Sequence, residues 1–422
     1  MKRLYNAELL TIGTEILQGE ILNTNARFLS EKLAEIGVGV KWHTTIGDNP
    51  ERIRQAFQTA LQRADIVVTT GGLGPTADDI TKECVCQVLG LELVEDALQM
   101  RRIEDFFRTR GIPMGETNRK QALVPQGSTV LYNPNGTAPG CWIVCGEKRA
   151  ALLPGPPREM CAMFMEQLKP LLQPFSSGVI LSHYVRTFGL GESRMAELAE
   201  SYLDLQNPTV APYANDGESY LRVTALAASA REAEDLCKPV IAKLRELLGE
   251  YVYAIDQTLE ETLFRLLKKH GLTVGIAESC TGGGIAAKLT EFAGASAVFG
   301  LGVVAYSNDA KQTLLGVRPK TLADHGAVSP HCAAEMAQGI RKLAGSDIGL
   351  SVTGIAGPTG DGTNKPVGLI YLSVADGVDT QTMRCETGRG DRQYNRTIAV
   401  KQALHLLLQV VLRREEKEES KQ

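Results

Sequence analysis

The stretch that decides the fold of the C-terminal part of the chain covers residues 272–284 and reads L-T-V-G-I-A-E-S-C-T-G-G-G. Its apolar part, 272–277, predicts a buried parallel strand, and 282–289 predict the start of a helix, so that Ser279 falls in the turn between them. Unpaired N–H groups at a helix start can hold a phosphate or an oxyanion, and successive glycines let a ligand approach the backbone. The stretch therefore predicts a ligand site in an α/β domain.

A second motif, Y-S-N-D-A-K at 306–311, follows one predicted helix and one predicted strand later. Residues 303–305 predict a strand that ends at Tyr306, and the S-N pair predicts the cap of a helix whose first turns carry Lys311. We expect Ser279, Tyr306 and Lys311 at the carboxyl ends of strands, where open parallel sheets bind ligands. Together they indicate amide or ester chemistry. Taken singly, each residue also has a purely structural explanation: Ser279 as a helix cap, Lys311 as a solvated lysine and Tyr306 as a residue at the border of the core.

The N-terminal part carries a different constellation. The sequence T-G-G-L-G-P-T-A-D-D-I-T-K at 70–82 follows a strand predicted at 65–69 and places Asp78 and Asp79 in the first turn of a helix predicted at 77–89. Such a loop can cradle a phosphate, and adjacent carboxylates can hold a hard divalent cation. The helix dipole alone also favours acidic residues there. The candidate nucleotide-binding residues of this part are Thr14, Glu15, Asn23, Asn25, Gly71, Gly72, Gly74, Thr76, Asn135, Gly155 and Pro156.

The length of 422 residues predicts two or three domains. Residues 1–173 alternate strand and helix patterns, among them a helix opened by Asn49 as cap and Pro50 in its first turn, which predicts an α/β domain with a mostly parallel sheet. Residues 179–254 follow a Pro, Ser and Gly linker and predict a small α+β module, with a strand ending near Phe188 and strands around 209–212 and 220–226. Residues 258–412 predict a further α/β domain, opened by the capping box T-L-E-E at 258–261.

Composition limits the possible functions. With 22% charged and 43% hydrophobic residues and a net charge of −4, the chain predicts a soluble cytoplasmic protein without a polyanion-binding surface. We find no signal peptide and no membrane-spanning pattern. The nine cysteines contain no C-x-x-C and are predicted to be reduced and mostly buried, and the six histidines lack metal-ligand spacing. The motifs G-x-G-x-x-G, the P-loop, G-x-S-x-G and H-E-x-x-H are absent, which disfavours dinucleotide redox chemistry and P-loop phosphoryl transfer.

Several rare motifs occur in one order: G-T-E-I-L-Q-G-E-I-L-N-T-N from residue 13, T-G-G-L-G-P-T-A-D-D from 70, A-E-S-C-T-G-G from 277, Y-S-N from 306 and G-I-A-G-P from 354. In these motifs the whole chain resembles the CinA (competence/damage-inducible protein A) family. The resemblance implies a molybdopterin-binding-like α/β domain, a small KH-like α+β module and a C-terminal α/β amidase domain.

The resemblance also implies site residues in the C-terminal domain. The implied reaction is hydrolysis of the carboxamide of nicotinamide mononucleotide to the acid and ammonia, with Ser279 as nucleophile, Lys311 as base and Tyr306 assisting them. No cofactor is implied for this domain. The implied substrate-binding residues are Thr281, Gly282, Gly283, Ser296, Asn308, Gly357 and Arg392.

For the N-terminal domain the resemblance implies an ADP-ribose pyrophosphatase that produces AMP and ribose 5-phosphate. A divalent metal (Mg, Mn or Co) is implied at Asp48, Asp78 and Asp79. The middle module lacks a G-x-x-G loop with basic flanks, so we expect a spacer or an oligomerisation element there and no direct nucleic-acid binding. Multi-domain α/β enzymes of this kind are commonly homodimers, and we expect a homodimer here.

Two other functions stay open at this point. A molybdopterin-type binding protein would use the loop at 70–82 without hydrolysis. An interaction protein in DNA uptake or damage response would keep its function without Ser279. The near-neutral charge argues against direct contact with DNA in the second case.

Overall fold

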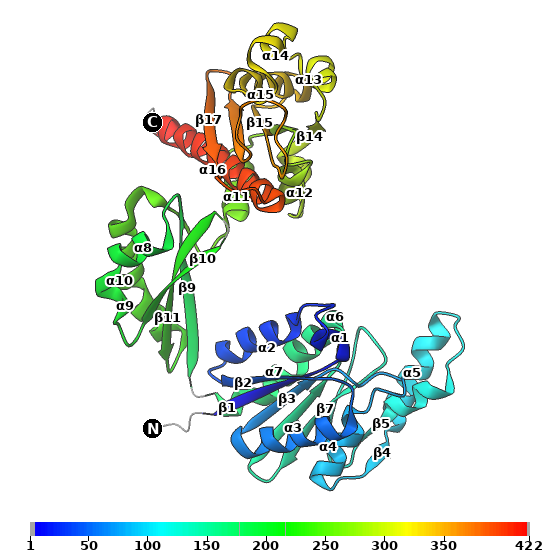
Figure 1. Ribbon diagram of the computed structural model, residues 1–422. Coiled ribbons are helices and arrows are strands. Elements are labelled where there is room, and N and C mark those ends of the chain that lie inside the picture. Colours follow the sequence, from blue (N-terminus) through cyan, green and yellow to red (C-terminus); the bar gives the residue numbers. More distant parts are fainter. Residues whose placement is uncertain (1–4, 177, 216, 420–422) are drawn as a thin grey trace. The chain divides into compact units, whose positions relative to one another are not determined.

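The computed structural model describes residues 5–176, 178–215 and 217–419. The chain divides into two compact units, Met1–Leu181 with Ala225–Leu236, and Ser182–Thr224 with Cys237–Gln422. The larger sheets are three: one near the N-terminus, one in the middle of the chain and one near the C-terminus (Figure 1). The predicted class, α/β with a small α+β module, is confirmed.

The N-terminal sheet has six strands in the order β2-β1-β3-β8-β7-β6. Its strands are β1 (Asn6–Ile12), β2 (Gly39–Ile46), β3 (Ile66–Thr70), β6 (Thr129–Leu131), β7 (Gly140–Cys145) and β8 (Lys148–Leu153). The first four in spatial order are parallel, whereas β7 and β6 add antiparallel pairs. Because the chain leaves β1 toward β2 on one side and later returns to β3 on the other, the order reverses at β1. The carboxyl ends of β1 and β3 therefore form a topological switch point, where α/β sheets bind ligands.

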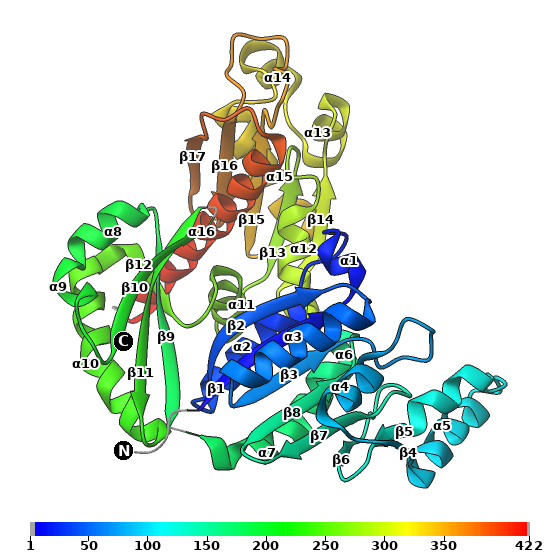
Figure 2. The ribbon, with the colours of Figure 1, turned by 60° about the horizontal axis from the view of Figure 1, so that its bottom comes forward.

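Helices cover both faces of this sheet (Figure 2). Leu9 of β1 lies in a core with α2 (Thr24–Glu35), α6 (Pro157–Met163) and the following turns, and the next residue, Leu10, lies in a core with α3 (Pro50–Arg63) and α4 (Thr81–Leu89). This alternation is the strand period of two with apolar side chains on both faces. The remaining elements are α1 (Thr14–Leu17), β4 (Leu93–Glu95), α5 (Ala97–Thr109), η1 (Glu116–Ala122), β5 (Leu123–Pro125), η2 (Phe164–Leu168), α7 (Lys169–Leu172) and η3 (Gln173–Phe175).

The middle of the chain forms a four-stranded sheet in the order β10-β11-β9-β12. Its strands are β9 (Val179–Phe188), β10 (Thr209–Asn215), β11 (Glu218–Ala227) and β12 (Val252–Ile255), and α8 (Glu192–Leu198), α9 (Glu200–Leu203) and α10 (Ala230–Leu248) gather on one side of the long strands in Figure 1. The sequence predicted the first three strands and missed β12, which follows the short helix η4 (Gly249–Tyr251).

The C-terminal sheet has the order β14-β13-β15-β16-β17. Its strands are β13 (Val274–Glu278), β14 (Phe299–Val304), β15 (Ile348–Gly354), β16 (Leu369–Ala375) and β17 (Thr380–Glu386). β14, β13 and β15 are parallel, and β16 and β17 are antiparallel additions. The order reverses at β13, so this sheet also has a switch point, at the carboxyl end of β13.

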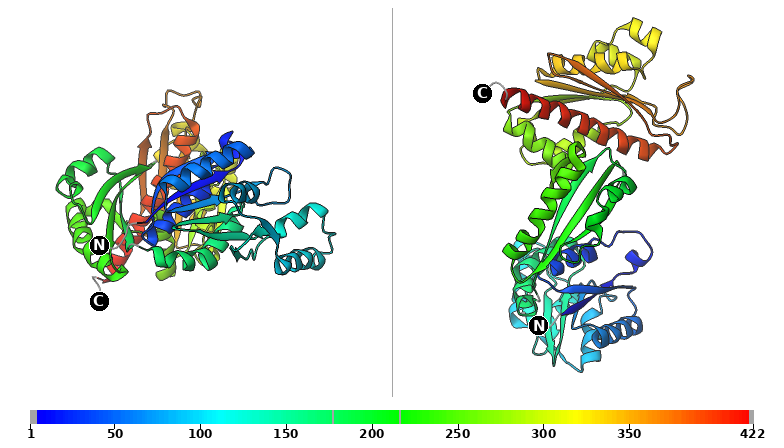
Figure 3. Two further views of the ribbon diagram at one scale, coloured as in Figure 1. Left: turned by 90° about the horizontal axis from the view of Figure 1, so that it is seen from below. Right: turned by 90° about the vertical axis from the view of Figure 1, so that its left-hand side faces the viewer.

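Helices again cover both faces. Ile276 of β13 lies in a core with α11 (Leu259–Lys269), α12 (Gly284–Thr290) and α16 (Arg392–Glu419), the long helix in red in Figure 3. The next residue, Ala277, lies in a core with α13 (Asn308–Leu315) and α15 (Pro330–Ala344). The shorter elements are η5 (Ala295–Ala297) and α14 (Pro319–His325).

Several predicted helix starts are confirmed by their caps. Asn49 accepts from the N–H of Arg52 at the start of α3, and Thr258 forms the predicted capping box with Glu261. The nine cysteines are free thiols and most are buried, as predicted. In the described part of the chain, no helix combines the length and hydropathy of a membrane span.

Candidate functional sites

The turn after β13 holds Ser279 against Lys311. Ser279 directly follows β13, and Lys311 lies in the first turns of α13, whose N-cap Ser307 accepts from the N–H of Ala310. Lys311 Nζ lies 3.1 Å from Ser279 Oγ, and the two residues are only 1% and 8% exposed. Because β13 and β14 are adjacent parallel strands, the loops after them meet at one edge of the sheet. The structure thus brings together the predicted nucleophile and the predicted base.

Two carbonyl groups fix the direction of the Lys311 amine. Nζ donates to the carbonyls of Ala305 at 2.8 Å and Tyr306 at 3.2 Å. In the neutral amine these two N–H bonds leave the lone pair directed at Ser279 Oγ. Burial lowers the pKa of Lys311 below its ordinary 10.5, opposed by the nearby thiols of Cys332 and Cys280. A buried neutral lysine of this kind can accept the proton of a serine hydroxyl.

Lys82 in α4 is a second buried lysine, and its surroundings differ from those of Lys311. It is 2% exposed, and burial lowers its pKa as well. Its Nζ donates to the carbonyls of Leu123 at 2.6 Å, Gln121 at 3.0 Å and Lys120 at 3.4 Å. Three carbonyls satisfy a protonated amine and hold no proton for it to accept. The feature that distinguishes Lys311 is therefore the serine hydroxyl and not burial.

The carboxylate of Glu278, the last residue of β13, occupies the start of α12. It is buried and accepts from the N–H groups of Gly283 at 3.0 Å, Ile285 at 3.1 Å and Ala286 at 2.9 Å. The expectation that the first N–H groups of this helix hold a phosphate or an oxyanion is therefore wrong for these three, because a side chain of the protein already caps them.

The backbone N–H of Thr281 is an open donor in this turn. The N–H of Gly282 donates to the carbonyl of Ser279 at 3.1 Å, whereas the N–H of Thr281 has no acceptor among the described residues. The buried hydroxyl of Thr281 also lacks a partner in the described part of the chain, and its carbonyl accepts from Arg396 Nη2 at 2.8 Å. Arg396 was not predicted, because it lies in α16, 115 residues later in the chain, and no motif marks it.

Arg392, the first residue of α16, connects the loops that follow β14 and β15. Its Nη1 donates to the carbonyl of Gly357 at 2.9 Å, and its Nη2 donates to the hydroxyl of Tyr306 at 3.1 Å. Tyr306 is 62% exposed, and it touches Lys311 through its backbone carbonyl. Its hydroxyl therefore lies beside the predicted substrate-binding arginine and not on the amine of Lys311.

The remaining predicted residues of this domain lie in three different positions. Gly282 and Gly283 form the turn before α12 with φ of 61° and 95°, a left-handed conformation that suits glycine. Asn308 is an exposed residue at the start of α13, at the same edge of the sheet. Ser296 lies in η5, just before β14, at the amino ends of the strands. The structure does not bring Ser296 to Ser279.

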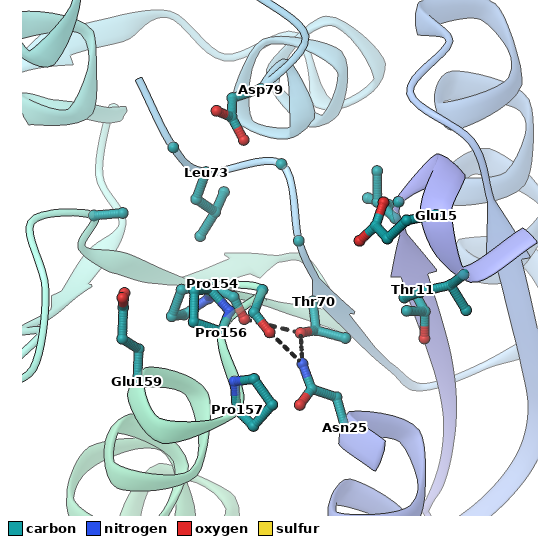
Figure 4. Close-up of a pocket in the computed structure, with 18 of the residues that line it drawn as sticks. Thr11, Glu15, Asn25, Thr70, Leu73, Asp79, Pro154, Pro156, Pro157 and Glu159 are labelled. Carbon is teal, nitrogen blue, oxygen red and sulfur yellow. Dashed lines mark hydrogen bonds between the residues drawn. The ribbon is translucent and has the colours of Figure 1, made fainter. Parts of the chain in front are cut away.

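A cavity of about 560 Å³ lies at the switch point of the N-terminal sheet, between the loops that follow β1, β3 and β8 (Figure 4). Its size is within the range of small-molecule sites. The predicted residues that line it are Glu15, Asn23, Asn25, Asp48, Gly71, Gly72, Gly74, Asp78, Asp79, Gly155 and Pro156. Three further predicted residues, Thr14, Thr76 and Asn135, do not line it; Thr14 and Thr76 donate to the lining residues Asp48 and Asp79, and Asn135 donates to the carbonyl of Arg158.

Asn25 connects the loops on one side of this cavity. Its Nδ2 donates to Thr70 Oγ1 at 2.9 Å and to the carbonyl of Gly155 at 2.7 Å, while Thr70 Oγ1 donates to the carbonyl of Pro154 at 2.9 Å (Figure 4). Asn25 is buried, and its Oδ1 has no partner among the described residues. A buried acceptor without a donor in a cavity wall is a group that a ligand can satisfy.

The two adjacent aspartates lie in the loop before α4. The helix begins at Thr81, so the prediction that Asp78 and Asp79 occupy its first turn is wrong. Both carboxylates instead bind Thr76: its Oγ1 contacts Asp78 and lies 2.5 Å from Asp79 Oδ2, and its N–H donates to Asp79 Oδ2 at 2.9 Å. The hydrogen bond from Thr76 lowers the pKa of Asp78. A Cβ on Gly74 would lie 2.4 Å from Asp79 Oδ2, so a larger residue there would displace the Asp79 carboxylate from its present position.

The carboxylates of this cavity are spread around its lining. Among the described residues that line it, five are acidic, namely Glu15, Asp48, Asp78, Asp79 and Glu159, and none is lysine, arginine or histidine. In the described ranges no three His, Cys, Asp or Glu residues are gathered to hold one metal ion, so the predicted aspartate trio does not form a complete site. Hard cations such as Mg²⁺ accept one or two carboxylates together with phosphate oxygens. The lining fits such an ion where ligand oxygens complete its shell.

Glu159 is an acidic lining residue that the sequence analysis did not name. Its Oε2 accepts from Asn133 Nδ2 at 2.6 Å, and a Cβ on Gly136 would lie 2.5 Å from its carboxyl carbon. The predicted Asn135 instead donates to the carbonyl of Arg158 at 3.1 Å. The available signal was an acidic residue in the first turn of α6, after a Pro-Gly loop at a strand end.

Three family models match consecutive parts of the chain. They are described as "Probable molybdopterin binding domain" for residues 8–174, "Damage-inducible protein CinA KH domain" for 182–254 and "CinA C-terminal domain" for 256–411. A "Putative competence-damage inducible protein" of Thermoanaerobacter pseudethanolicus is 46% identical over 96% of this chain and 98% of its own length. A "CinA-like protein" of Kosmotoga olearia is 47% identical over 96% of this chain and 99% of its own.

Among solved structures, the chain is similar to a Thermoplasma acidophilum protein described as "the protein CinA with unknown function". The two are 36% identical, the match covers 40% of this chain and 98% of that one, and the TM-score is 0.37.

Proposed function

The chain belongs to the CinA family, and from this membership and the Ser279–Lys311 pair we propose that its C-terminal domain is a nicotinamide-nucleotide amidase. The proposed reaction converts nicotinamide mononucleotide and water into nicotinate mononucleotide and ammonia. The observation that carries the proposal is the buried contact of 3.1 Å between Lys311 Nζ and Ser279 Oγ, with two carbonyls directing the amine at the hydroxyl.

In the proposed first half-reaction, Ser279 Oγ attacks the carboxamide carbon while its proton passes to Lys311 Nζ. The C–N bond then breaks, and the amide nitrogen takes that proton from Lys311 and leaves as ammonia. The N–H of Thr281, which lacks an acceptor among the described residues, lies in the same turn and is proposed to stabilise the oxyanion. The products of this half-reaction are an ester on Ser279 and a neutral Lys311.

In the second half-reaction, a water molecule attacks the ester carbon and gives a proton to Lys311 Nζ. The bond between carbon and Ser279 Oγ breaks, and the oxygen recovers its proton from Lys311. The released acid ionises in water. Lys311 thus acts as base and acid in turn, which requires an amine that changes protonation easily, and its lowered pKa meets that requirement.

Substrate recognition is proposed to come from the loops that surround this pair. Arg392 presents a guanidinium between Tyr306 and Gly357 at the edge of the site, and the nucleotide phosphate is the natural partner for such a group. Asn308 lies at the same edge as a further donor. No residue outside these loops is proposed to contact the pyridine ring.

The test is ammonia release from nicotinamide mononucleotide by the full chain, in the presence of a chelator. We expect release that the chelator does not affect and that the Ser279→Ala variant loses. The Lys82→Met variant, altered at the other buried lysine, should keep it. Equal release by Ser279→Ala and the unaltered protein would refute the proposal.

A second activity is proposed for the acidic cavity of the N-terminal domain: hydrolysis of ADP-ribose to AMP and ribose 5-phosphate. The specific observation in its favour is a lining with five carboxylates and no basic side chain. A divalent cation, when bound, supplies the positive charge that a diphosphate needs in such a lining. Asp78 and Asp79 are the residues proposed to hold it, Gly74 leaves room for the Asp79 carboxylate, and Asn25 offers its free Oδ1 to a ligand hydroxyl.

AMP release from ADP-ribose tests this second activity. We expect it to need added Mg²⁺, Mn²⁺ or Co²⁺, to be lost in Asp79→Asn and to be retained in Ser279→Ala. Tight binding of a molybdopterin-type pterin with no turnover of ADP-ribose would favour the binding-protein alternative instead.

A further inference from the structure

A second cavity, of about 340 Å³, lies in the N-terminal domain and shares Thr137 with the acidic cavity. It is lined by α5, the helix at the right of Figure 1, and by residues that follow β6. The two cavities differ in charge. Among the described residues, the charged ones that line the first are all acidic, whereas those that line the second are Arg102, Arg110 and one carboxylate, Asp105.

Both guanidinium groups lie over aromatic rings. Arg102 Cζ lies 4.1 Å from the ring centroid of Tyr132, and Arg110 Cζ lies 3.6 Å from that of Phe106. Stacking of this kind restricts the side chain while the N–H groups at the edge of the guanidinium remain available as donors. The arginines are thus arranged before any ligand binds, which reduces the entropy that binding costs.

Neither arginine has an acidic partner among the described residues. Arg110 Nη1 donates only to the carbonyl of Phe106 at 3.2 Å. Asp105, the one carboxylate of the lining, is paired with Arg108 at 2.6 Å, and Arg108 does not line the cavity. Two positive groups therefore lie in one concave surface with no counter-charge of their own, and an anion from outside the chain would supply it.

Spacing along the helix explains why the two arginines share the cavity. Arg102, Phe106 and Arg110 are four residues apart, so their side chains lie along one side of α5. Eight residues correspond to about 12 Å along the helix axis. The half-exposed ring of Tyr132, which follows β6, also lines the cavity. A compact anion with a sugar-sized organic part fits this arrangement better than a bare ion, because the walls include two aromatic rings.

We propose that this cavity binds a phosphomonoester through Arg102 and Arg110, at a site separate from the acidic cavity and from Ser279. Phosphate oxygens match the fork of a guanidinium, and the sugar part of a sugar phosphate contacts the rings of Tyr132 and Phe106. The site needs no metal ion, since its own charge is positive. It is independent of both proposed activities.

The test is calorimetric titration of the full chain with ribose 5-phosphate in the presence of a chelator, which prevents metal-dependent binding in the acidic cavity. We expect saturable binding that weakens at high salt and falls at least tenfold in Arg102→Gln and in Arg110→Gln. Arg101→Gln is the matched control, because it removes an exposed neighbouring arginine of the same helix that does not line the cavity and leaves the Arg108–Asp105 pair intact.

Absence of saturable binding to the unaltered chain would overturn the proposal, and so would an equal loss in Arg101→Gln. Circular dichroism and thermal melting of each variant, compared with the unaltered chain, show whether α5 is intact. All three arginines extend from a surface helix, so we expect unchanged melting. A loss of binding in the two cavity variants at unchanged melting temperature is then the supporting result.

Discussion

Replacement of Lys311 by methionine tests the proposed dyad most directly. Methionine keeps an unbranched side chain in the buried slot and removes only the amine. Loss of a general base reduces the rate by about 10²–10⁴-fold, or roughly 3–5 kcal/mol in activation free energy. The carbonyls of Ala305 and Tyr306 lose their donor, at a cost of about 1–3 kcal/mol each. This cost is partly offset because no amine has to be desolvated. We therefore expect a folded domain with at least a hundredfold lower kcat.

The assay is ammonia release at saturating nicotinamide mononucleotide, with calorimetric binding of the same nucleotide as a check that the site is intact. If Ser279 and Lys311 act as one unit, the double variant Ser279→Ala/Lys311→Met should be no slower than the slower single variant. Lys82→Met controls for loss of a buried lysine and should leave the amidase rate unchanged. A folded Lys311→Met protein with kcat within tenfold of the unaltered chain would refute the dyad, as would losses that multiply in the double variant.

Three further predictions concern pH and stability. Since burial lowers the pKa of Lys311 and only the neutral amine is a base, kcat/KM for the amidase should rise with pH along a limb centred below 10.5; a pH-rate series with its limb at 10.5 or above would contradict this. Glu278→Ala leaves three helix N–H groups without an acceptor and should cost about 3–6 kcal/mol in urea unfolding, more than Glu278→Gln; a loss below about 1 kcal/mol would exclude the capping role. Lys401→Met leaves the carboxylates of Glu218 and Glu260 buried without their cation and should cost about 3–5 kcal/mol at neutral pH. The pKa of Glu260 is lowered and that of Lys401 is raised, so this contribution to stability holds between about pH 4.5 and 10.5. It disappears as the pH falls through the folded-state pKa of Glu260 or rises through that of Lys401. Denaturation curves across this pH range test the prediction, and a stability difference between the variant and the unaltered chain that does not change with pH would contradict it.

The sequence correctly predicted those helix starts that are defined by a side-chain cap. The caps at Asn49, Thr258 and Ser307 lie where the sequence placed them, because each needs only a side chain and an N–H group two or three residues later. The start of α4 was placed too early for a related reason. Asp78 and Asp79 resemble helix-start residues, but both bind Thr76 within the loop, so the helix begins only after them.

The parts of the site that depend on tertiary contacts could not be predicted from the sequence. Arg396 donates to the carbonyl of Thr281 from 115 residues away, and Ser296 lies at the amino ends of the parallel strands, whereas Ser279 lies at their carboxyl ends. No spacing along the chain encodes either fact. The 3.1 Å contact between Lys311 and Ser279 was within reach of prediction only because two adjacent parallel strands bring their following loops together.

The same sequence signal, a buried strand followed by a glycine turn and a helix, leaves the N–H groups of the following helix in different states at the two switch points. The last residue of the strand accounts for this difference. In β13 that residue is Glu278, whose carboxylate caps the following helix, so the N–H groups of Gly283, Ile285 and Ala286 are already occupied. In β3 it is Thr70, whose hydroxyl bonds sideways to Pro154, and α4 begins without any side-chain cap. A glycine turn therefore predicts where a ligand approaches, whereas the final strand residue helps to decide whether the N–H groups of the following helix are already occupied.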